Sequence, residues 1–227
     1  MRNEGEPESF EEAKNDTHSR KWLSARQDEM DFVHDNHTYE LTKLPKGKRT
    51  LRNKWVYKLK LRDAGNPPRY KSRIVVKGFQ QKKGVDFDEI FASVLKITSI
   101  QTVLSIATSM DLEVEQQDVK TTFLHGHLEE EIYMQQPEGL VKNGKENLVC
   151  RLKTSLYGLK QVPREWNQMF NSFMIDHGYH KTQANHCVFV KRFDRGDFLI
   201  LLLYVDDMLI VGWDPKKIGS WKKDLSK

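Results

Sequence analysis

The segment FLILLLYVDDMLIVG, residues 198–212, places two adjacent aspartates between two apolar stretches. Each stretch has the length of a buried strand, so the segment predicts a β-hairpin with Asp206 and Asp207 at its turn. Burying an unpaired carboxylate is unfavourable, and two neighbouring carboxylates also repel each other. Two interpretations remain open. The pair lies at a solvated hairpin tip, or divalent cations supply the missing positive charge, because Mg²⁺ prefers carboxylate oxygens.

A third carboxylate ends another strand-like segment, DLEVEQQD, whose last residue is Asp118. A carboxylate at the end of one strand can meet a carboxylate pair on a neighbouring hairpin. Together they would hold two Mg²⁺ ions about 3.5–4 Å apart, the arrangement used for in-line phosphoryl transfer. The alternative for Asp118 is a helix N-cap, with Thr121 nearby.

The net charge of +5 hides an uneven distribution of charge along the chain. Residues 41–85 hold 15 basic side chains and one acidic side chain, whereas residues 86–150 hold 4 basic and 12 acidic ones. A polyanion-binding surface beside a cation-binding surface has this pattern. The alternative is a solvated basic face, which charge runs often form.

The basic segment is typical of a β-hairpin. Residues 55–61 alternate at period two with lysine on one face, residues 63–68 form a turn, and residues 69–77 return as a second strand. We therefore expect its lysine and arginine side chains to point outward together.

Helices and antiparallel strands are mixed along the rest of the chain, which predicts an α+β fold. Residues 1–20 are Glu-rich with almost no large apolar side chains, and we expect a flexible acidic leader there. Helices are expected from Trp22 to about Asn36, at 97–107, at 164–177 and from Pro215 onward. Further strands are expected at 112–118, 187–191, 198–204 and 208–212, and residues 124–150 are rich in turn formers.

Other features exclude several classes of protein. Cys150 and Cys187 give neither a disulfide framework nor a metal-ligand spacing, so we expect free, buried thiols. The longest apolar run, residues 198–205, is less than half the roughly 18 residues that a membrane span needs. The acidic N-terminus does not match a secretory signal. We expect a soluble intracellular protein with no membrane partner.

Five motifs together resemble the reverse transcriptase region of Ty1/copia-type retrotransposon Pol polyproteins. They occur in the order of the family and span nearly the whole chain. The motifs are RYKSRIVVKGFQ (69–80), QDVKTTFLHG (117–126), EIYMQQPEG (131–139), SLYGLKQVPREW (155–166) and YVDDMLIVG (204–212).

This resemblance implies the fingers and palm of a right-hand polymerase, with an antiparallel palm sheet backed by helices and with the thumb missing from these 227 residues. The N-terminal helix and the basic fingers would occupy residues 21–105. The palm would occupy residues 106–227, with an interleaved fingers segment at about 124–160.

The resemblance also implies roles for individual residues. Asp118, Asp206 and Asp207 match the catalytic aspartates, which hold two Mg²⁺ ions, with Mn²⁺ as a substitute. Phe123 matches the aromatic side chain that favours dNTPs over ribonucleotides; its alternative is a core phenylalanine. The other residues implied in nucleotide binding are Lys71, Arg73, Tyr157, Gly158 and Lys160. For Lys71 the alternative is contact with the template backbone, and for Gly158 it is a structural turn.

The implied activity is RNA-directed DNA polymerisation, with dNTPs and an RNA or DNA template-primer as partners. A second copy of the chain or the remainder of the Pol polyprotein are the implied protein partners. The expected location is the cytoplasm, within a virus-like particle, or else the nucleus. The rival hypothesis is a catalytically dead remnant that still binds nucleic acid through its basic segment.

Overall fold

The computed structural model describes residues 5–61, 67–119, 126, 128–141 and 143–225. Strands β10 (Phe198–Tyr204) and β11 (Asp207–Gly212) form the antiparallel hairpin that the sequence predicts. Tyr204 pairs with Asp207, so Val205 and Asp206 are the two turn residues. The side chains at 199–203 are all buried, which is the pattern of a strand covered on both faces.

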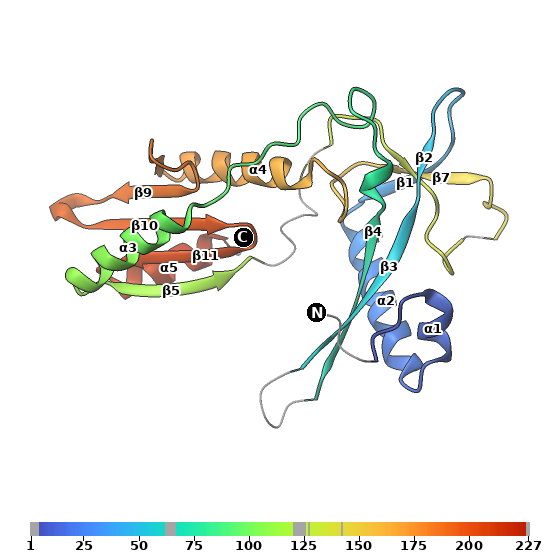
Figure 1. Cartoon of the computed structure of the whole chain (residues 1–227), viewed down its shortest axis with the longest axis horizontal. Coiled ribbons are helices and arrows are strands. Elements are labelled where there is room, and N and C mark those ends of the chain that lie inside the picture. Colours follow the sequence, from blue (N-terminus) through green and yellow to red (C-terminus); the bar gives the residue numbers. More distant parts are fainter. Residues whose placement is uncertain (1–4, 62–66, 120–125, 127, 142, 226–227) are drawn as a thin grey trace. The chain divides into compact units, whose positions relative to one another are not determined.

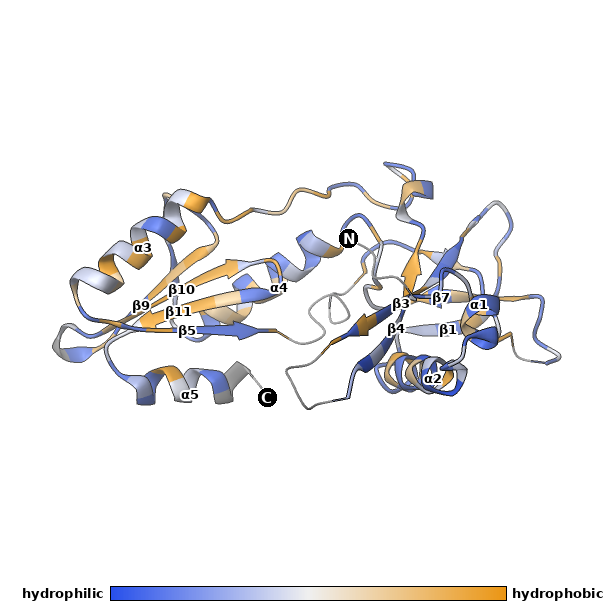
Figure 2. Cartoon of the chain, turned by 60° about the horizontal axis from the view of Figure 1, so that its bottom comes forward, coloured by the Kyte–Doolittle hydropathy of each residue, from blue (hydrophilic) through white to orange (hydrophobic). Residues whose placement is uncertain are grey.

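This hairpin is the centre of a five-stranded antiparallel sheet with strand order β5-β11-β10-β9-β8 (Figure 1). The other strands are β5 (Glu113–Asp118), β8 (His180–Lys181) and β9 (Val188–Arg192). The central strand β10 is hydrophobic and the edge strand β5 is hydrophilic, as the orange and blue colours show (Figure 2).

Helices cover both faces of this sheet. Helix α3 (Ile97–Ser109) contributes Val103 to a buried cluster that contains Ile200 of β10. The opposite face carries α4 (Val162–Asp176), whose Phe170 ring lies 5.6 Å from the ring of Phe189. The last helix, α5 (Pro215–Leu225), begins after Asp214, whose side chain accepts a hydrogen bond from the Lys216 amide. The predicted helices at 97–107, 164–177 and from Pro215 are confirmed.

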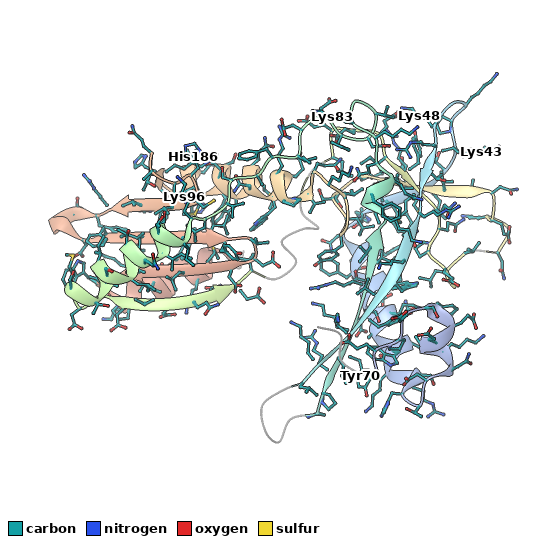
Figure 3. All side chains as sticks on the ribbon, in the orientation of Figure 1. Lys43, Lys48, Tyr70, Lys83, Lys96 and His186 are labelled. Carbon is teal, nitrogen blue, oxygen red and sulfur yellow. The ribbon has the colours of Figure 1, made fainter. Side chains whose placement is uncertain are left out.

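The basic hairpin is also confirmed. Strands β3 (Asn53–Lys60) and β4 (Arg69–Val76) pair antiparallel, and most of their expected turn lies outside the described residues. Helix α2 (Ser19–Asp35) packs on the apolar face of this hairpin. The Trp22 ring of α2 stands edge-on to Tyr70, which is labelled in Figure 3, at 4.6 Å between ring centroids.

A second sheet is not apparent from the sequence. Its strand order is β1-β7-β6-β2, and β2 pairs with β6 in parallel. Its strands are β1 (Tyr39–Lys43), β2 (Thr50–Leu51), β6 (Tyr133–Met134) and β7 (Leu148–Leu152). Short 3₁₀ helices lie at Gly78–Gln80 and Asp194–Gly196. The acidic leader contains helix α1 (Phe10–Asn15), whose Ala13 is fully buried.

These elements confirm the α+β class, and they divide into two compact units. One unit contains Met1–Ile90 and Phe123–Glu165, and the other contains Phe91–Thr122 and Trp166–Lys227. The expected division into fingers at 21–105 and palm at 106–227 stays a prediction.

Both cysteines are free and buried, as predicted, and burial raises the pKa of the Cys150 thiol to about 12. Among the described helices none is long and apolar enough to cross a membrane.

Candidate active site

The structure brings two of the three predicted catalytic carboxylates face to face. Strand β11 pairs with β5 so that Asp207 lies directly opposite Asp118. Side chains of such cross-strand partners project from the same face, with Cβ atoms roughly 4.5–5.5 Å apart. The third aspartate, Asp206, is in the adjacent turn, and its carbonyl accepts a hydrogen bond from the Val119 amide at 2.9 Å. The three residues therefore share one end of the sheet, while their roles stay predictions.

The facing pair is an unfavourable arrangement of charge by itself. Asp118 and Asp207 are both exposed, and like charges directly opposite each other destabilise a sheet. The Gln116 side chain donates a hydrogen bond to Asp207 at 3.2 Å between Nε2 and Oδ1. In the part of the chain that the structure describes, no three His, Cys, Asp or Glu side chains form a metal-binding group. The carboxylates thus form an open donor set.

The turn that carries Asp206 has a strained backbone. Val205, its first residue, has a φ of 56°, in the left-handed region that β-branched side chains rarely adopt. A positive φ at the first position alone is typical of a type II′ turn, where glycine is the usual residue. Strain of this kind persists only where the surroundings enforce it, and it is concentrated at functional sites.

The other unit contains the predicted phosphate-binding residues. In the β3–β4 hairpin Lys58 faces Lys71 and Lys60 faces Arg69, so these cations lie on one face. The alternate side chains of both strands are the more buried ones, as expected for a half-buried hairpin. Burial lowers the pKa of Lys71, and the neighbouring charges of Arg73, Lys60 and Arg69 lower it further. Lys60 and Arg69 of this face are exposed, as the sequence predicts, whereas the Lys58 ammonium is paired with the Glu6 carboxylate.

The depressed pKa of Lys71 leads to a prediction. The pKa of Lys71 in the folded chain lies below its ordinary value of 10.5, so protonated Lys71 destabilises the folded state at pH 7. This destabilisation disappears above pH 10.5, where the side chain is deprotonated in both the folded and the unfolded state. We expect K71Q to raise the free energy of unfolding in urea at pH 7. The alternative role of Lys71, contact with the template backbone, predicts in addition that K71Q reduces the slope of log affinity for template against log salt by about one.

The matched control for K71Q is K54Q, because Lys54 lies on the same face of the hairpin but is exposed. K54Q should leave the unfolding free energy unchanged. A K71Q variant that is less stable than the wild type, or that keeps the full salt slope, contradicts the prediction.

The loop that contains Tyr157, Gly158 and Lys160 packs tightly against β4. The Val76 amide donates a hydrogen bond to the Tyr157 carbonyl at 2.7 Å. Gly158 has a φ of 94°, and a Cβ built on it would lie 2.1 Å from the Val76 carbonyl oxygen. The Arg73 guanidinium lies 4.8 Å from the centroid of the Tyr157 ring. The structure thus brings Arg73 and Tyr157 together, and glycine is required by close packing and by the positive φ.

Lys160 belongs to a buried polar network that sequence reasoning missed. Its amide donates to Gln81 Oε1 at 2.7 Å, and the Gln81 side chain donates in turn to Gln161 Oε1 at 3.0 Å. Gln161 is fully buried and donates to the Asp86 carbonyl at 3.0 Å, while Asp86 forms an ion pair with Arg49. Glutamine in a loop has no sequence signal that distinguishes this role from a solvated one. Phe123, the predicted steric gate, lies outside the described residues.

A family model described as "Reverse transcriptase (RNA-dependent DNA polymerase)" matches residues 36–227. The chain belongs to this family. The match covers both the facing carboxylates and the basic hairpin.

Relatives of this reverse transcriptase chain support the same assignment. It is 58% identical over 222 residues to the Retrovirus-related Pol polyprotein from transposon TNT 1-94 of Nicotiana tabacum. The aligned residues are 98% of this chain and 17% of that protein. It is 35% identical over 226 residues to the Retrovirus-related Pol polyprotein from transposon RE1 of Arabidopsis thaliana. These residues are 99% of this chain and 15% of that protein. The Transposon Ty1-BL Gag-Pol polyprotein of Saccharomyces cerevisiae is 28% identical over 159 residues, which are 70% of this chain and 8% of that protein. The resemblance to Ty1/copia-type Pol polyproteins is therefore confirmed, and the chain spans less than a fifth of the length of these relatives.

Proposed function

We propose that this chain performs metal-dependent nucleotidyl transfer, adding dNTPs to a primer 3′-OH on an RNA or DNA template. The observation that carries the proposal is the register that sets Asp118 opposite Asp207, beside Asp206 in the strained turn. In this proposal the five-stranded sheet and its helices correspond to a palm, and the unit with the basic hairpin corresponds to fingers.

The open set of carboxylates suits Mg²⁺. This ion demands oxygen ligands and usually takes one or two protein carboxylates, completing its coordination with water and substrate phosphates. A closed group of protein ligands is therefore unnecessary here. We assign the ions to Asp118 and Asp206, with Asp207 in support and Mn²⁺ as a substitute. When bound, two such ions neutralise phosphate charge and lower the pKa of an attacking hydroxyl.

The unit that contains the β3–β4 hairpin, called the basic unit below, supplies positive charge for phosphates. Arg73 offers a planar guanidinium that can contact phosphate oxygens in a bidentate manner, and it is oriented by the Tyr157 ring. Lys71 adds a half-buried ammonium on the same strand face. Gly158 and Lys160 shape the loop beside them, and Phe123 is proposed as the gate against ribonucleotides. The template-primer, dNTPs and the remainder of a Pol polyprotein are the partners in this proposal.

Primer extension on poly(rA)/oligo(dT) tests the proposed activity. We expect the chain to show weak extension that requires Mg²⁺ or Mn²⁺. We expect D206N to abolish it, because the variant replaces a proposed metal-binding carboxylate with a neutral amide. The matched control is D176N, since Asp176 is exposed at the end of α4 in the same unit. D176N should retain extension.

The outcome separates the proposal from its rival. If the wild type and D206N are equally inactive at every Mg²⁺ and Mn²⁺ concentration, the proposed activity of this chain is wrong. Salt-dependent binding of template without extension would then favour the non-catalytic, nucleic-acid-binding alternative.

A further inference from the structure

The carbonyl groups of both turn residues at the catalytic hairpin are held by donors from other elements. The Asp206 carbonyl accepts from the Val119 amide, which follows β5. The Val205 carbonyl accepts from the indole N–H of Trp166 at 3.0 Å. Because Trp166 belongs to α4, these two bonds attach the turn to a strand on one side and to a helix on the other. All of these residues lie in one compact unit.

The Trp166 side chain is buried and held in place by aromatic packing. Only 6% of its surface is exposed, and its ring lies 5.4 Å from the Phe170 ring on the next turn of α4. Phe170 in turn packs edge-on against Phe189 of β9. The indole is therefore held by the core of the unit, and its N–H has a fixed direction.

The bond acts on the peptide group that decides the type of turn. In a two-residue hairpin, types I′ and II′ differ in the orientation of the central peptide, here the one that joins Val205 to Asp206. Type I′ needs positive φ at both residues, whereas here Val205 has a positive φ and Asp206 does not. A donor aimed at the Val205 carbonyl selects one orientation of this peptide. Loss of this donor would free Val205 to leave its left-handed φ, and a change of that φ would move the Cα atom of Asp206 and, with it, the carboxylate.

We propose that Trp166 is a positioning residue whose indole N–H holds the Val205 carbonyl and so sets the direction of the Asp206 carboxylate. The proposal rests on the proposed function in one respect, namely that the direction of this carboxylate matters for catalysis. It also explains why valine is sustained in a conformation that favours glycine, since the donor stabilises the strained turn from outside.

The matched pair of variants is W166F and W221F. Trp221 of α5 is 4% exposed in the same unit, and its indole nitrogen has no hydrogen-bond partner among the described residues. Both changes remove similar buried volume, but only W166F removes a donated hydrogen bond. We expect W166F to lower kcat for primer extension by about tenfold, the effect of one lost hydrogen bond, with the KM for dNTP changed by less than about twofold.

A second substitution separates positioning from simple support of the fold. Glycine at position 205 prefers the observed turn without help, so V205G should make Trp166 less important. In the V205G background we expect the kcat ratio between Trp and Phe at position 166 to shrink to about twofold. An undiminished ratio there, or equal losses of kcat in W166F and W221F, overturns the proposal.

Nuclear magnetic resonance tests the hydrogen bond from the Trp166 indole to the Val205 carbonyl, here called the clamp, without any catalysis. In the unmodified chain we expect the Trp166 indole proton to exchange with solvent far more slowly than that of Trp213, which is 44% exposed. W166F should shift the amide signals of Asp206 and Asp207, and W221F should leave them in place.

These measurements keep the two proposals apart. Slow indole exchange together with the expected shifts supports the clamp even if the chain shows no extension, in which case only the proposed activity fails. An indole proton of Trp166 that exchanges as fast as that of Trp213 overturns the clamp, whether or not W166F folds.

Discussion

D118N is expected to eliminate primer extension while making the folded chain more stable. The activity should fall by about a thousandfold or more, because in the proposed function the Asp118 carboxylate holds a metal ion that neutralises phosphate charge. Stability should rise by roughly 0.2–1 kcal/mol, because the substitution removes a like-charge repulsion between directly opposed strands. Primer extension and urea unfolding in the absence of divalent ions measure the two effects on the same samples.

The control for D118N is E113Q on the same strand. Glu113 is exposed and pairs with Gly212, so no carboxylate faces it across the sheet. E113Q should change the unfolding free energy by less than about 0.5 kcal/mol and leave extension intact. Addition of Mg²⁺ should raise the unfolding midpoint of the wild type more than that of D118N, because ligands that bind the folded state stabilise it. A D118N variant that is destabilised, or that keeps its activity, contradicts the assignment.

G158A is expected to destabilise strongly the basic unit, which contains the basic hairpin. Its new methyl group would overlap the Val76 carbonyl oxygen, and its φ of 94° would strain any residue with a Cβ. The loop cannot move away easily, because the Tyr157 carbonyl is bonded to the Val76 amide. We expect a loss of at least about 3 kcal/mol in unfolding free energy, measured by urea denaturation.

G47A isolates the contribution of the clash. Gly47 also has a positive φ, 82°, but a Cβ built on it meets no described atom within 4 Å. It should therefore show only the backbone strain, about 1–2 kcal/mol. Equal losses in the two variants would show that close packing against β4 is unimportant.

Local patterns predicted most of the elements that carry the candidate site. The hairpin at 198–212 could be predicted because two continuous apolar segments flank a two-residue polar turn, and the basic hairpin because it alternates at period two. The sequence also indicated that Asp118 ends a strand near Asp206 and Asp207. It did not specify the register that sets Asp118 opposite Asp207, since cross-strand alignment depends on long-range packing.

The missed features have physical causes of the same kind. Strands β2 and β6 have two residues each and pair in parallel across about 80 positions, so periodicity cannot reveal them. Helix α1 did have a signal, because Ser9 caps the amide of Glu12 in the spacing of a capping box. Trp166 reads as a core residue of a helix, and only the packing of α4 shows where its N–H points.

The position of β5 at the margin of its sheet has a consequence for self-association. A strand at an edge presents unpaired backbone groups to any other chain, which is a common route to aggregation. This strand is EVEQQD, so a second copy aligned alongside it would bring carboxylates near one another. The acidic residues that accompany Asp118 thus act as gatekeepers against β-sheet extension, so the strand that carries Asp118 remains accessible to solvent without promoting aggregation.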